Sequence, residues 1–404
     1  MSSVDHSHGP DESTTGRHIP ALDGVRGLAI LSVLYCHLFW SNPYPVGSSL
    51  LRFFAQTRNA GWIGVNLFFV LSGFLITGIL YDTLPSRHFF RNFYARRVLR
   101  IFPLYYGFLL LLILITSLRG EHWTRAIFGY LTYTENLPLT GQALTDAYWV
   151  NINHFWSLAI EEQFYLVWPL LVFLLRTRRR ISIAAAFGVL ASLGIRIGLV
   201  LSGFTVSHPY AIYGWTPTSL DGLCLGAILA MAIRSRFRRT VIAWSPLALL
   251  TCCVLLGIAW HLDPGFVVLG QPMFSTWGLT LLALTFTSLI AVCLKPGGFL
   301  EQFASAPALR FFGRYSYGLY VYHYTIGGLV ISRLRPELLA RFGSKALSII
   351  IPGLIATGVS VAVAWCSFTF YESRFLRLKE YFHDSSRRRK LQEFVEERPA
   401  PALH

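Results

Sequence analysis

The chain has 404 residues, of which 54% are hydrophobic and only 14% are charged, and its mean hydropathy is +0.50. Soluble domains typically carry about 25% charged residues, so this composition excludes an ordinary soluble protein. The net charge of +15 does not indicate nucleic-acid binding, because the basic residues fall between apolar blocks, as in RTRRR (176–180). Basic residues in such positions set the topology of membrane proteins.

Apolar blocks of about twenty residues, the length that crosses a bilayer core, recur along the chain. They predict an all-α, polytopic membrane protein with about ten transmembrane helices, at 21–40, 61–81, 99–118, 154–175, 181–202, 217–233, 241–261, 273–294, 315–333 and 347–371. We expect one integral membrane domain at 18–380, between a disordered N-terminal tail (1–17) and a disordered basic and polar C-terminal tail (381–404). The N-terminal tail lacks the apolar core of a cleaved signal peptide.

The distribution of arginine and lysine predicts that both termini are cytoplasmic, because the segments on that side are the more basic ones. One segment disagrees. Residues 333–345 should lie outside, yet they include Arg333, Arg335, Arg341 and Lys345. An amphipathic surface helix, or an error in the number of spans near the C-terminus, would each account for this segment.

The first predicted span contains two ionisable side chains, Arg26 and His37, which are costly inside a membrane and are candidates for function. Eleven residues separate them, 20° beyond three full helical turns, so they share a helix face about 16 Å apart. Each has an ordinary explanation, since an arginine can extend its charge to the interface and a buried histidine can be hydrogen-bonded for structural reasons. Their shared face favours a functional pair.

Basic and acidic residues also lie in or next to later spans. Arg97 and Arg100 share a face at spacing i, i+3, and such a pair can hold phosphates by bidentate hydrogen bonds, although arginines also flank spans for topological reasons. Glu161 and Glu162 lie inside the apolar run in the first part of the fourth span, where a carboxylate can orient a histidine or pair with a neighbouring helix. His323 lies in the middle of the ninth span, with a structural or a functional role.

Other site types receive little support. His37, His154 and His323 are far apart in the sequence and no HxxxH or HExxH pattern occurs, so no metal site is predicted. No phosphate-binding loop or GxSxG nucleophile pattern is present either. The small residues of GVNLFFVLSGFLITG (64–78) suit close helix packing more than catalysis.

Six motifs in a fixed order resemble one known family. They are LDGVRGLAILSVLYCHLFW, GWIGVNLFFVLSGFLI, RRVLRIFPLYY, HFWSLAIEEQFYLVWPLL, LDGLCLGAILA and YSYGLYVYHY. Together they are similar to membrane-bound acyltransferase family 3, bacterial O-acyltransferases that modify surface polysaccharides or natural products, over about residues 18–380. The resemblance implies a multi-pass protein of the bacterial plasma (inner) membrane. Such a protein takes an acyl group, most often acetyl, from cytoplasmic acyl-CoA and passes it to a hydroxyl group.

The resemblance also implies partners and site residues. Acyl-CoA is a donor substrate and not a permanently bound cofactor, the acceptor is a carbohydrate or a glycosylated molecule, and the lipid bilayer surrounds the protein. Carried over by position, the family's site residues are His37, Glu161 and Glu162 for catalysis, Arg26, Arg97 and Arg100 for donor binding, and His323 as site lining. Asn66, Ser72 and Tyr165 are further candidates for the site lining. In this scheme His37 is a general base that Glu161 or Glu162 orients; an acyl-histidine intermediate is the rival mechanism.

The chain departs from the family pattern at three points. Asn66 stands where many members have an acid, which leaves any role for a charge there in doubt. The closing segment YESRF (371–375) lacks the proline of the usual IExP. The fused esterase-like domain of many members is not found in these 404 residues, so a separate periplasmic transferase is a candidate partner.

A secondary transporter of a small polar or glycosidic substrate is the main alternative, because transporters also place histidine and glutamate within spans. It predicts substrate uptake without consumption of acyl-CoA, and many transporters consist of repeated halves. We find no internal repeat in the sequence.

Overall fold

The structure, a computed structural model, describes residues 19–39, 57–58, 60–137, 152–208, 211–263 and 271–382. Within these ranges the chain forms helices and no β-strand. In chain order the helices are α1 (Pro20–Leu38), α3 (Ile63–Thr83), α4 (Phe89–Leu118), α5 (Ile127–Thr132), η1 (Asn153–Phe155), α6 (Trp156–Leu175), α7 (Arg178–Leu201), α8 (Phe204–Ser207), α9 (Ala211–Gly214), α10 (Thr216–Ile233), α11 (Arg238–Leu262), η2 (Phe274–Gly278), α12 (Leu279–Cys293), α13 (Phe299–Ala304), α14 (Pro307–Phe342), α15 (Leu347–Ser367), η3 (Phe368–Glu372), α16 (Ser373–Arg377) and η4 (Leu378–Phe382).

The prediction of an all-helical, polytopic membrane protein is confirmed. Each predicted span falls on a helix, and in the described part of the chain nine helices are long and apolar enough to cross a membrane. Helix α14, which carries the predicted span 315–333, is not among the nine because its central residues include five tyrosines and His323. The predicted tails lie outside the described residues except for Tyr381 and Phe382, and the sidedness of the chain stays a prediction.

Two helices are longer than their apolar blocks. Helix α4 begins at Phe89, well before the predicted start at 99, so Arg97 and Arg100 lie within the helix. Helix α14 continues to Phe342 and ends where Gly343 adopts φ +62°. The dissenting segment 333–345 is therefore mostly the last turns of a long helix and not a separate surface helix. Arginine is a good helix former, so both helices continue past the apolar residues that the prediction used.

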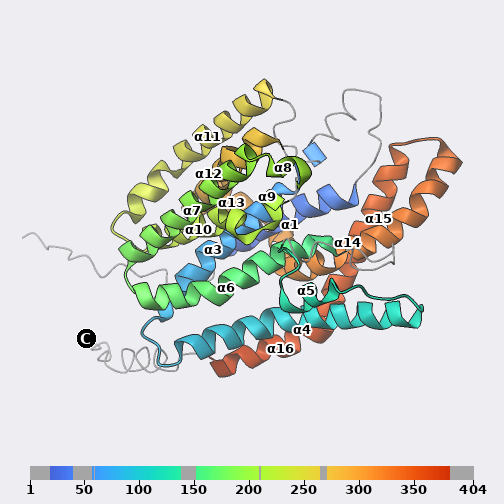
Figure 1. Ribbon diagram of the computed structural model, residues 1–404, viewed down its shortest axis with the longest axis horizontal. Coiled ribbons are helices and arrows are strands. Elements are labelled where there is room, and N and C mark those ends of the chain that lie inside the picture. The colour runs from blue at the N-terminus through green and yellow to red at the C-terminus, as the bar shows by residue number, and fades with distance from the viewer. Residues whose placement is uncertain are drawn as a thin grey trace, which may run out of the picture.

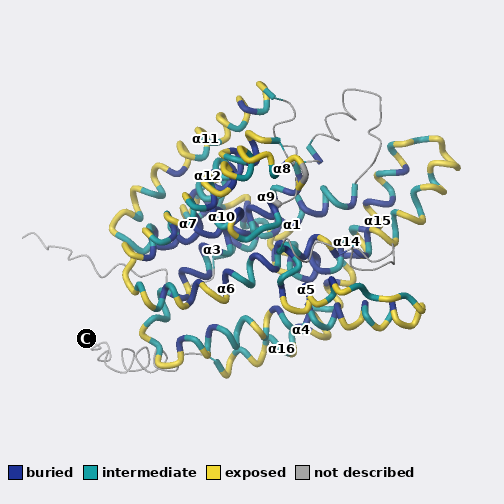
Figure 2. The backbone as a smooth tube through the Cα atoms, in the orientation of Figure 1, coloured by how far each residue is buried: buried dark blue, intermediate teal, exposed yellow. Residues whose placement is uncertain are grey.

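The helices form an inner group and an outer group. Helices α1, α3 and α10 run through the centre of the molecule, while α11 lies along one edge and α4 along the opposite edge (Figure 1). The share of buried residues in the most apolar stretch is 72% for α3 and for α10 but 6% for α11, and Figure 2 shows the same gradient. Helix α14 packs along α1 on one side and along α15 on the other. The side chains of α11 can therefore contact lipid. The side chains of α1, α3 and α14 lie in the interior, where they can form a site.

Glycines allow the inner helices to touch backbone to backbone. A Cβ atom at Gly73 on α3 would lie 1.9 Å from the carbonyl oxygen of Leu223 on α10, and one at Gly27 on α1 would lie 2.0 Å from that of Leu309 on α14. Small residues at such crossings are typical of membrane helices, which associate by close packing. The prediction that 64–78 serves close helix packing is confirmed at Gly73.

Substitution of Gly73 by alanine should lower the free energy of unfolding by about 1–3 kcal/mol, because the added methyl group forces the backbones of α3 and α10 apart. Gly194→Ala on α7 is the matched control, since nothing lies within 4 Å of a Cβ atom there. The control should be neutral, or stabilising by up to about 1 kcal/mol through its higher helix propensity. Unfolding of the purified protein in mixed micelles, followed by tryptophan fluorescence, measures both. Equal effects at the two positions would contradict this view of the crossing.

A buried ion pair ties three further helices together. The Arg196 side chain on α7 is fully buried, and its Nη2 atom donates to Asp221 Oδ2 on α10 at 2.8 Å. The same guanidinium donates to Thr280 Oγ1 on α12 at 2.6 Å and to the carbonyl oxygen of Thr218 at 2.6 Å. A buried charge is tolerated only when it is paired and hydrogen-bonded, and here both conditions are met.

Candidate active site

Three histidines from distant parts of the chain meet in the interior. His37 is on α1, His154 on η1 and His323 on α14. The ring centroids of His37 and His323 are 5.1 Å apart and those of His154 and His323 are 4.9 Å apart. His323 and His154 are buried, with 0% and 4% exposure. Sequence spacing gave no sign of this cluster, and His154 was not among the predicted site residues.

Hydrogen bonds assign the proton positions on two of these rings. His323 Nδ1 faces two acceptors, the carbonyl oxygens of Leu319 at 3.0 Å and Tyr320 at 2.9 Å, so this nitrogen carries the proton. Its Nε2 atom is then an acceptor, 2.8 Å from His37 Nδ1, and His37 Nδ1 must donate. A neutral imidazole carries one proton, which leaves the lone pair of His37 on Nε2. The pair therefore holds His37 in the tautomer that a general base requires.

Glu161 and Glu162 do not take the place that the sequence analysis gave them. The partner of the His37 ring among the described residues is His323 and not a carboxylate. Both glutamates, on α6, instead line a pocket together with the three arginines predicted to bind the donor. Helix α6 packs against α3, and this packing presents the start of α6 to that pocket.

The arginine pocket has a volume of about 1010 Å³ including its open mouth. Arg26 on α1 and Arg97 and Arg100 on α4 line it, so the structure brings together three residues predicted as one group. Arg26 Nη1 donates to Asp23 Oδ1 at 2.9 Å, whereas Arg97 and Arg100 have no ion pair with a described residue. The volume is at the upper end of the range for small-molecule sites, and two unpaired guanidinium groups favour an anionic ligand.

A hydrogen-bonded chain crosses the wall of the arginine pocket. Tyr165 OH donates to Glu161 Oε2 at 3.2 Å, and the hydroxyl groups of Ser72 and Tyr165 are also hydrogen-bonded to each other. The Arg97 guanidinium lies 5.2 Å from the centre of the Tyr165 ring, an attractive arrangement of a cation and an aromatic face. Ser72 and Tyr165 were predicted as site lining, and both line this pocket.

The inner end of the arginine pocket adjoins the histidines. Ser157 and Tyr320 line the pocket, and their hydroxyl groups are 2.6 Å apart. Tyr320 OH donates to the carbonyl oxygen of His154 at 2.9 Å, while His154 Nε2 bonds to the carbonyl oxygen of Tyr320 at 2.8 Å. Tyr320 also accepts from His323, so a ligand that fills the pocket reaches residues that contact the histidine cluster.

Gln163, which follows the two glutamates, holds a neighbouring segment against α6. Its Nε2 atom donates to the carbonyl oxygen of Tyr133 at 2.7 Å and to Asn136 Oδ1 at 2.8 Å.

Glu135 lies between Tyr133 and Asn136 in the sequence, and its carboxyl oxygens are buried without a hydrogen-bond partner among the described residues. Burial raises the pKa of Glu135 to about 8, since desolvation disfavours the charged form. Glu135 is therefore largely protonated at neutral pH.

The remaining expectations concern Asn66 and metal ions. Asn66 is buried on α3 at 9% exposure and does not line the arginine pocket. Among the described residues no group of three or more histidine, cysteine, aspartate or glutamate side chains is placed to hold a metal ion.

Comparison with known proteins gives one family and several relatives. The model of a family described as "Acyltransferase domain" matches residues 19–372. Peptidoglycan O-acetyltransferase OatA of Listeria monocytogenes is 29% identical over 336 residues, which cover 77% of this chain and 49% of that protein. O-acetyltransferase OatA of Staphylococcus aureus (strain NCTC 8325 / PS 47) is 29% identical over 344 residues, covering 77% and 51%. The chain spans about half the length of these relatives, and no solved structure matches it.

Proposed function

This chain belongs to the acyltransferase family whose model matches residues 19–372, and we propose that it transfers an acetyl group from acetyl-CoA to a hydroxyl group of a sugar-containing acceptor at or across the membrane. The observation that carries the proposal is that Tyr320, which lines the arginine pocket, is hydrogen-bonded to His154 of the histidine cluster. One end of this site suits an anionic donor and the other end holds a base. The names of the relatives favour a peptidoglycan sugar as the acceptor.

The donor is held by charge in this proposal. Coenzyme A carries several phosphate charges at one end and the acyl thioester at the other. Arg97 and Arg100 offer planar groups of donors that match phosphate oxygens, and Arg26 lies close enough to interact with both electrostatically. Glu161 and Glu162 offset part of the positive charge of the pocket, and Glu161 positions Tyr165 by accepting a hydrogen bond from its hydroxyl group. The pantetheine arm then runs along the pocket toward Ser157 and Tyr320.

His37 is the general base of the proposed reaction. Its Nε2 atom takes the proton of the acceptor hydroxyl as the oxygen attacks the thioester carbonyl. The new carbon–oxygen bond forms, the carbon–sulfur bond breaks, and the imidazolium returns the proton to the departing thiolate. The hydrogen bond from His37 Nδ1 to His323 keeps a proton on Nδ1, so that the lone pair is on Nε2 before the proton is taken up and again after it is returned.

An acyl-histidine intermediate is the alternative order of the same bond changes. In that mechanism His37 Nε2 attacks the thioester and the acceptor hydroxyl then attacks the acyl-imidazole. Incubation with radiolabelled acetyl-CoA in the absence of acceptor distinguishes the two. Label that stays with the wild-type protein but not with His37→Ala supports the covalent route, and protein without label supports direct transfer.

The cellular setting follows from the same proposal. We place the chain in the bacterial inner membrane as a multi-pass protein with the mouth of the arginine pocket on the cytoplasmic side, where acyl-CoA is found. A separate periplasmic transferase is a candidate partner for the last step to the acceptor.

The proposal is tested by measuring binding and turnover of acetyl-CoA with the purified protein in a neutral detergent. Arg97→Gln/Arg100→Gln should weaken binding by about tenfold to hundredfold, because hydrogen bonds to charged groups are lost. Arg179→Gln/Arg180→Gln removes the same charge from exposed positions at the start of α7 and should leave binding unchanged. If the wild type has no affinity for acetyl-CoA or for longer acyl-CoAs, the donor assignment is wrong.

A further inference from the structure

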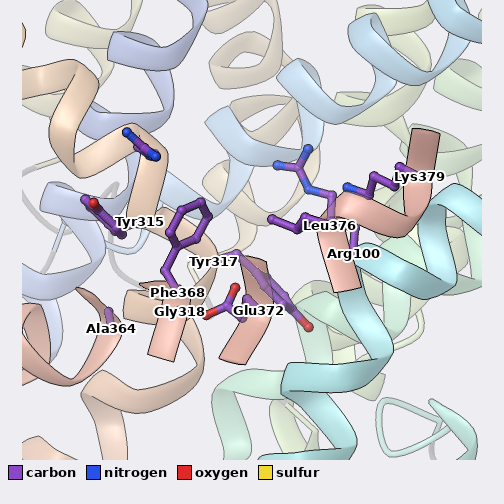
Figure 3. A pocket seen from close by; sticks show the side chains of 10 residues that line it. Arg100, Tyr315, Tyr317, Gly318, Ala364, Phe368, Glu372, Leu376 and Lys379 are labelled. Atoms are coloured by element: carbon purple, nitrogen blue, oxygen red, sulfur yellow. The ribbon is translucent and has the colours of Figure 1, made fainter. Parts of the chain in front are cut away.

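A second pocket lies beside the arginine pocket and shares Arg100 and Tyr317 with it. Its volume is about 530 Å³ including its open mouth. In Figure 3 Arg100 and Lys379 lie on one side of this pocket, Tyr315 and Phe368 on the other, and Glu372 between them. Arg314 also lines this pocket, and no sequence motif predicted a role for Arg314 or Lys379.

The second pocket carries an excess of positive charge. Three cations, Arg100, Arg314 and Lys379, line it together with one carboxylate, Glu372. No ion pair joins any of these cations to a described residue, and the positive charges of Arg97 and Arg100 act on Lys379. Like charges that lie close together repel one another, and one carboxylate offsets only part of three positive charges, so an anion placed among them reduces the repulsion.

The acidic residue and one of the cations are already held in place. Glu372 is buried at 8% exposure, and its Oε1 atom accepts from Ser367 Oγ at 3.0 Å. The Arg314 guanidinium lies 5.1 Å from the centre of the Phe368 ring and 5.7 Å from that of Tyr315. Stacking fixes the plane of a guanidinium group and leaves its N–H donors at the edge for an oxyanion.

The second pocket is farther from the histidine cluster than the arginine pocket is. Along α14 the arginine pocket reaches Tyr320, three residues before His323, or about 4.5 Å. On the same helix the second pocket is lined from Arg314, nine residues or about 14 Å before His323, to Gly318, five residues or about 7.5 Å before it. An extended ligand whose reactive end lies near the histidines can therefore place its opposite end beside Arg314.

We propose that the second pocket binds the ribose 3′-phosphate of the coenzyme A donor, with Arg314 and Lys379 as the residues specific to this group. The inference rests on the proposed function, since acyl-CoA is taken as the donor. The 3′-phosphate is a monoester that carries close to two negative charges and is the end of coenzyme A most distant from the thioester. The phosphate of an anionic lipid headgroup has related chemistry, and the experiment distinguishes the two sources.

The test compares acetyl-CoA with acetyl-3′-dephospho-CoA, which lacks only this phosphate. In a neutral detergent the wild type should bind acetyl-CoA about tenfold to hundredfold more tightly, because two charge-assisted contacts are lost with the phosphate. Arg314→Gln/Lys379→Gln should bind the two ligands within about threefold of each other. Its affinity for the dephospho ligand should match that of the wild type, which also shows that the variant is folded.

Arg236→Gln/Arg239→Gln is the matched control, because it removes two charges from the predicted cytoplasmic face outside both pockets. This variant should keep the wild-type preference for the 3′-phosphate. A wild type without any preference, or a preference that persists in Arg314→Gln/Lys379→Gln, overturns the inference while leaving the proposed function intact. A wild type that binds neither ligand contradicts the proposed function itself.

A lipid arm completes the experiment. Phosphatidylglycerol is added to the micelles and thermal unfolding is measured for the wild type and for Arg314→Gln/Lys379→Gln. The inference expects the lipid to raise the unfolding temperature of both proteins equally. Stabilisation that depends on Arg314 and Lys379, together with an unchanged preference for the 3′-phosphate, would assign the pocket to a lipid headgroup instead.

Discussion

Replacement of His37 by alanine should lower the turnover of acetyl transfer by about 10³-fold or more, while the dissociation constant for acetyl-CoA changes by less than about threefold. A positioned general base contributes roughly 10²–10⁴-fold to a rate, and His37 lies at the histidine cluster and not among the residues that line the arginine pocket. Single-turnover kinetics and equilibrium binding on the same preparations separate the two effects. His261→Ala, which removes an exposed histidine at the end of α11, should match the wild type in both.

Substitution of His323, the hydrogen-bond partner of His37, tests the role of His37 in a second and independent way. His323→Leu removes the acceptor that faces His37 Nδ1 and should lower turnover by about tenfold to hundredfold without weakening donor binding, because a buried donor is left unpaired and the ring is free to change tautomer. His323→Gln supplies a side-chain oxygen as an acceptor and should recover part of the loss. A His37→Ala protein that keeps a turnover within tenfold of the wild type would show that another group accepts the proton.

Loss of the buried ion pair should have the largest effect on stability. Substitution of Arg196 by leucine should lower the free energy of unfolding by about 3–5 kcal/mol, because it leaves Asp221 buried without its cation. Three helices depend on this guanidinium group, since it binds Asp221 on α10 and Thr280 on α12 from its own position on α7. Unfolding in mixed micelles measures the change, and helical circular dichroism identifies which fraction of the protein has unfolded.

Two further variants test whether the loss of stability arises from a buried charge that has lost its partner. Arg234, which directly follows α10, pairs with Asp82 on α3 at 2.7 Å, with side-chain exposures of 22% and 17%, so Arg234→Leu should lower stability clearly less than Arg196→Leu. The double variant Arg196→Leu/Asp221→Leu removes both charges and should be more stable than Arg196→Leu alone. If the double variant is the less stable of the two, the uncompensated carboxylate is not the source of the loss.

The sequence was sufficient to predict the long apolar helices and much of the arginine pocket. Apolar blocks located each span, because length and hydropathy determine which segments cross a bilayer. The spacing of Arg97 and Arg100 and the motif around Arg26 predicted residues that the fold does bring to one pocket. These features are local, or belong to recognisable motifs, and depend little on how the helices pack.

Contacts between distant helices could not be predicted in the same way. His154 precedes α6 by two residues and reaches the cluster only because η1 packs against α14 through Tyr320. Arg196 lies in an otherwise apolar span, where an arginine is costly and therefore a candidate for a specific role. Its partners are on α10 and α12, and the sequence does not show which helices pack against it. The partner of His37 was expected to be a glutamate, because carboxylates orient many catalytic histidines, and only the packing of α1 on α14 shows a second histidine in that position.

Helix α14 also restricts how the length of this sequence can vary. Arg314, Tyr317, Tyr320 and His323 all lie on one uninterrupted helix, and Arg26 and His37 lie on another. Insertion or deletion of one residue between them would rotate everything beyond it by 100° and shift it by 1.5 Å. The donor end and the base would then face different directions even though every side chain was still present. We therefore expect natural insertions and deletions in related chains to fall in the connecting loops, and the intervals from 26 to 37 and from 314 to 323 to keep their length.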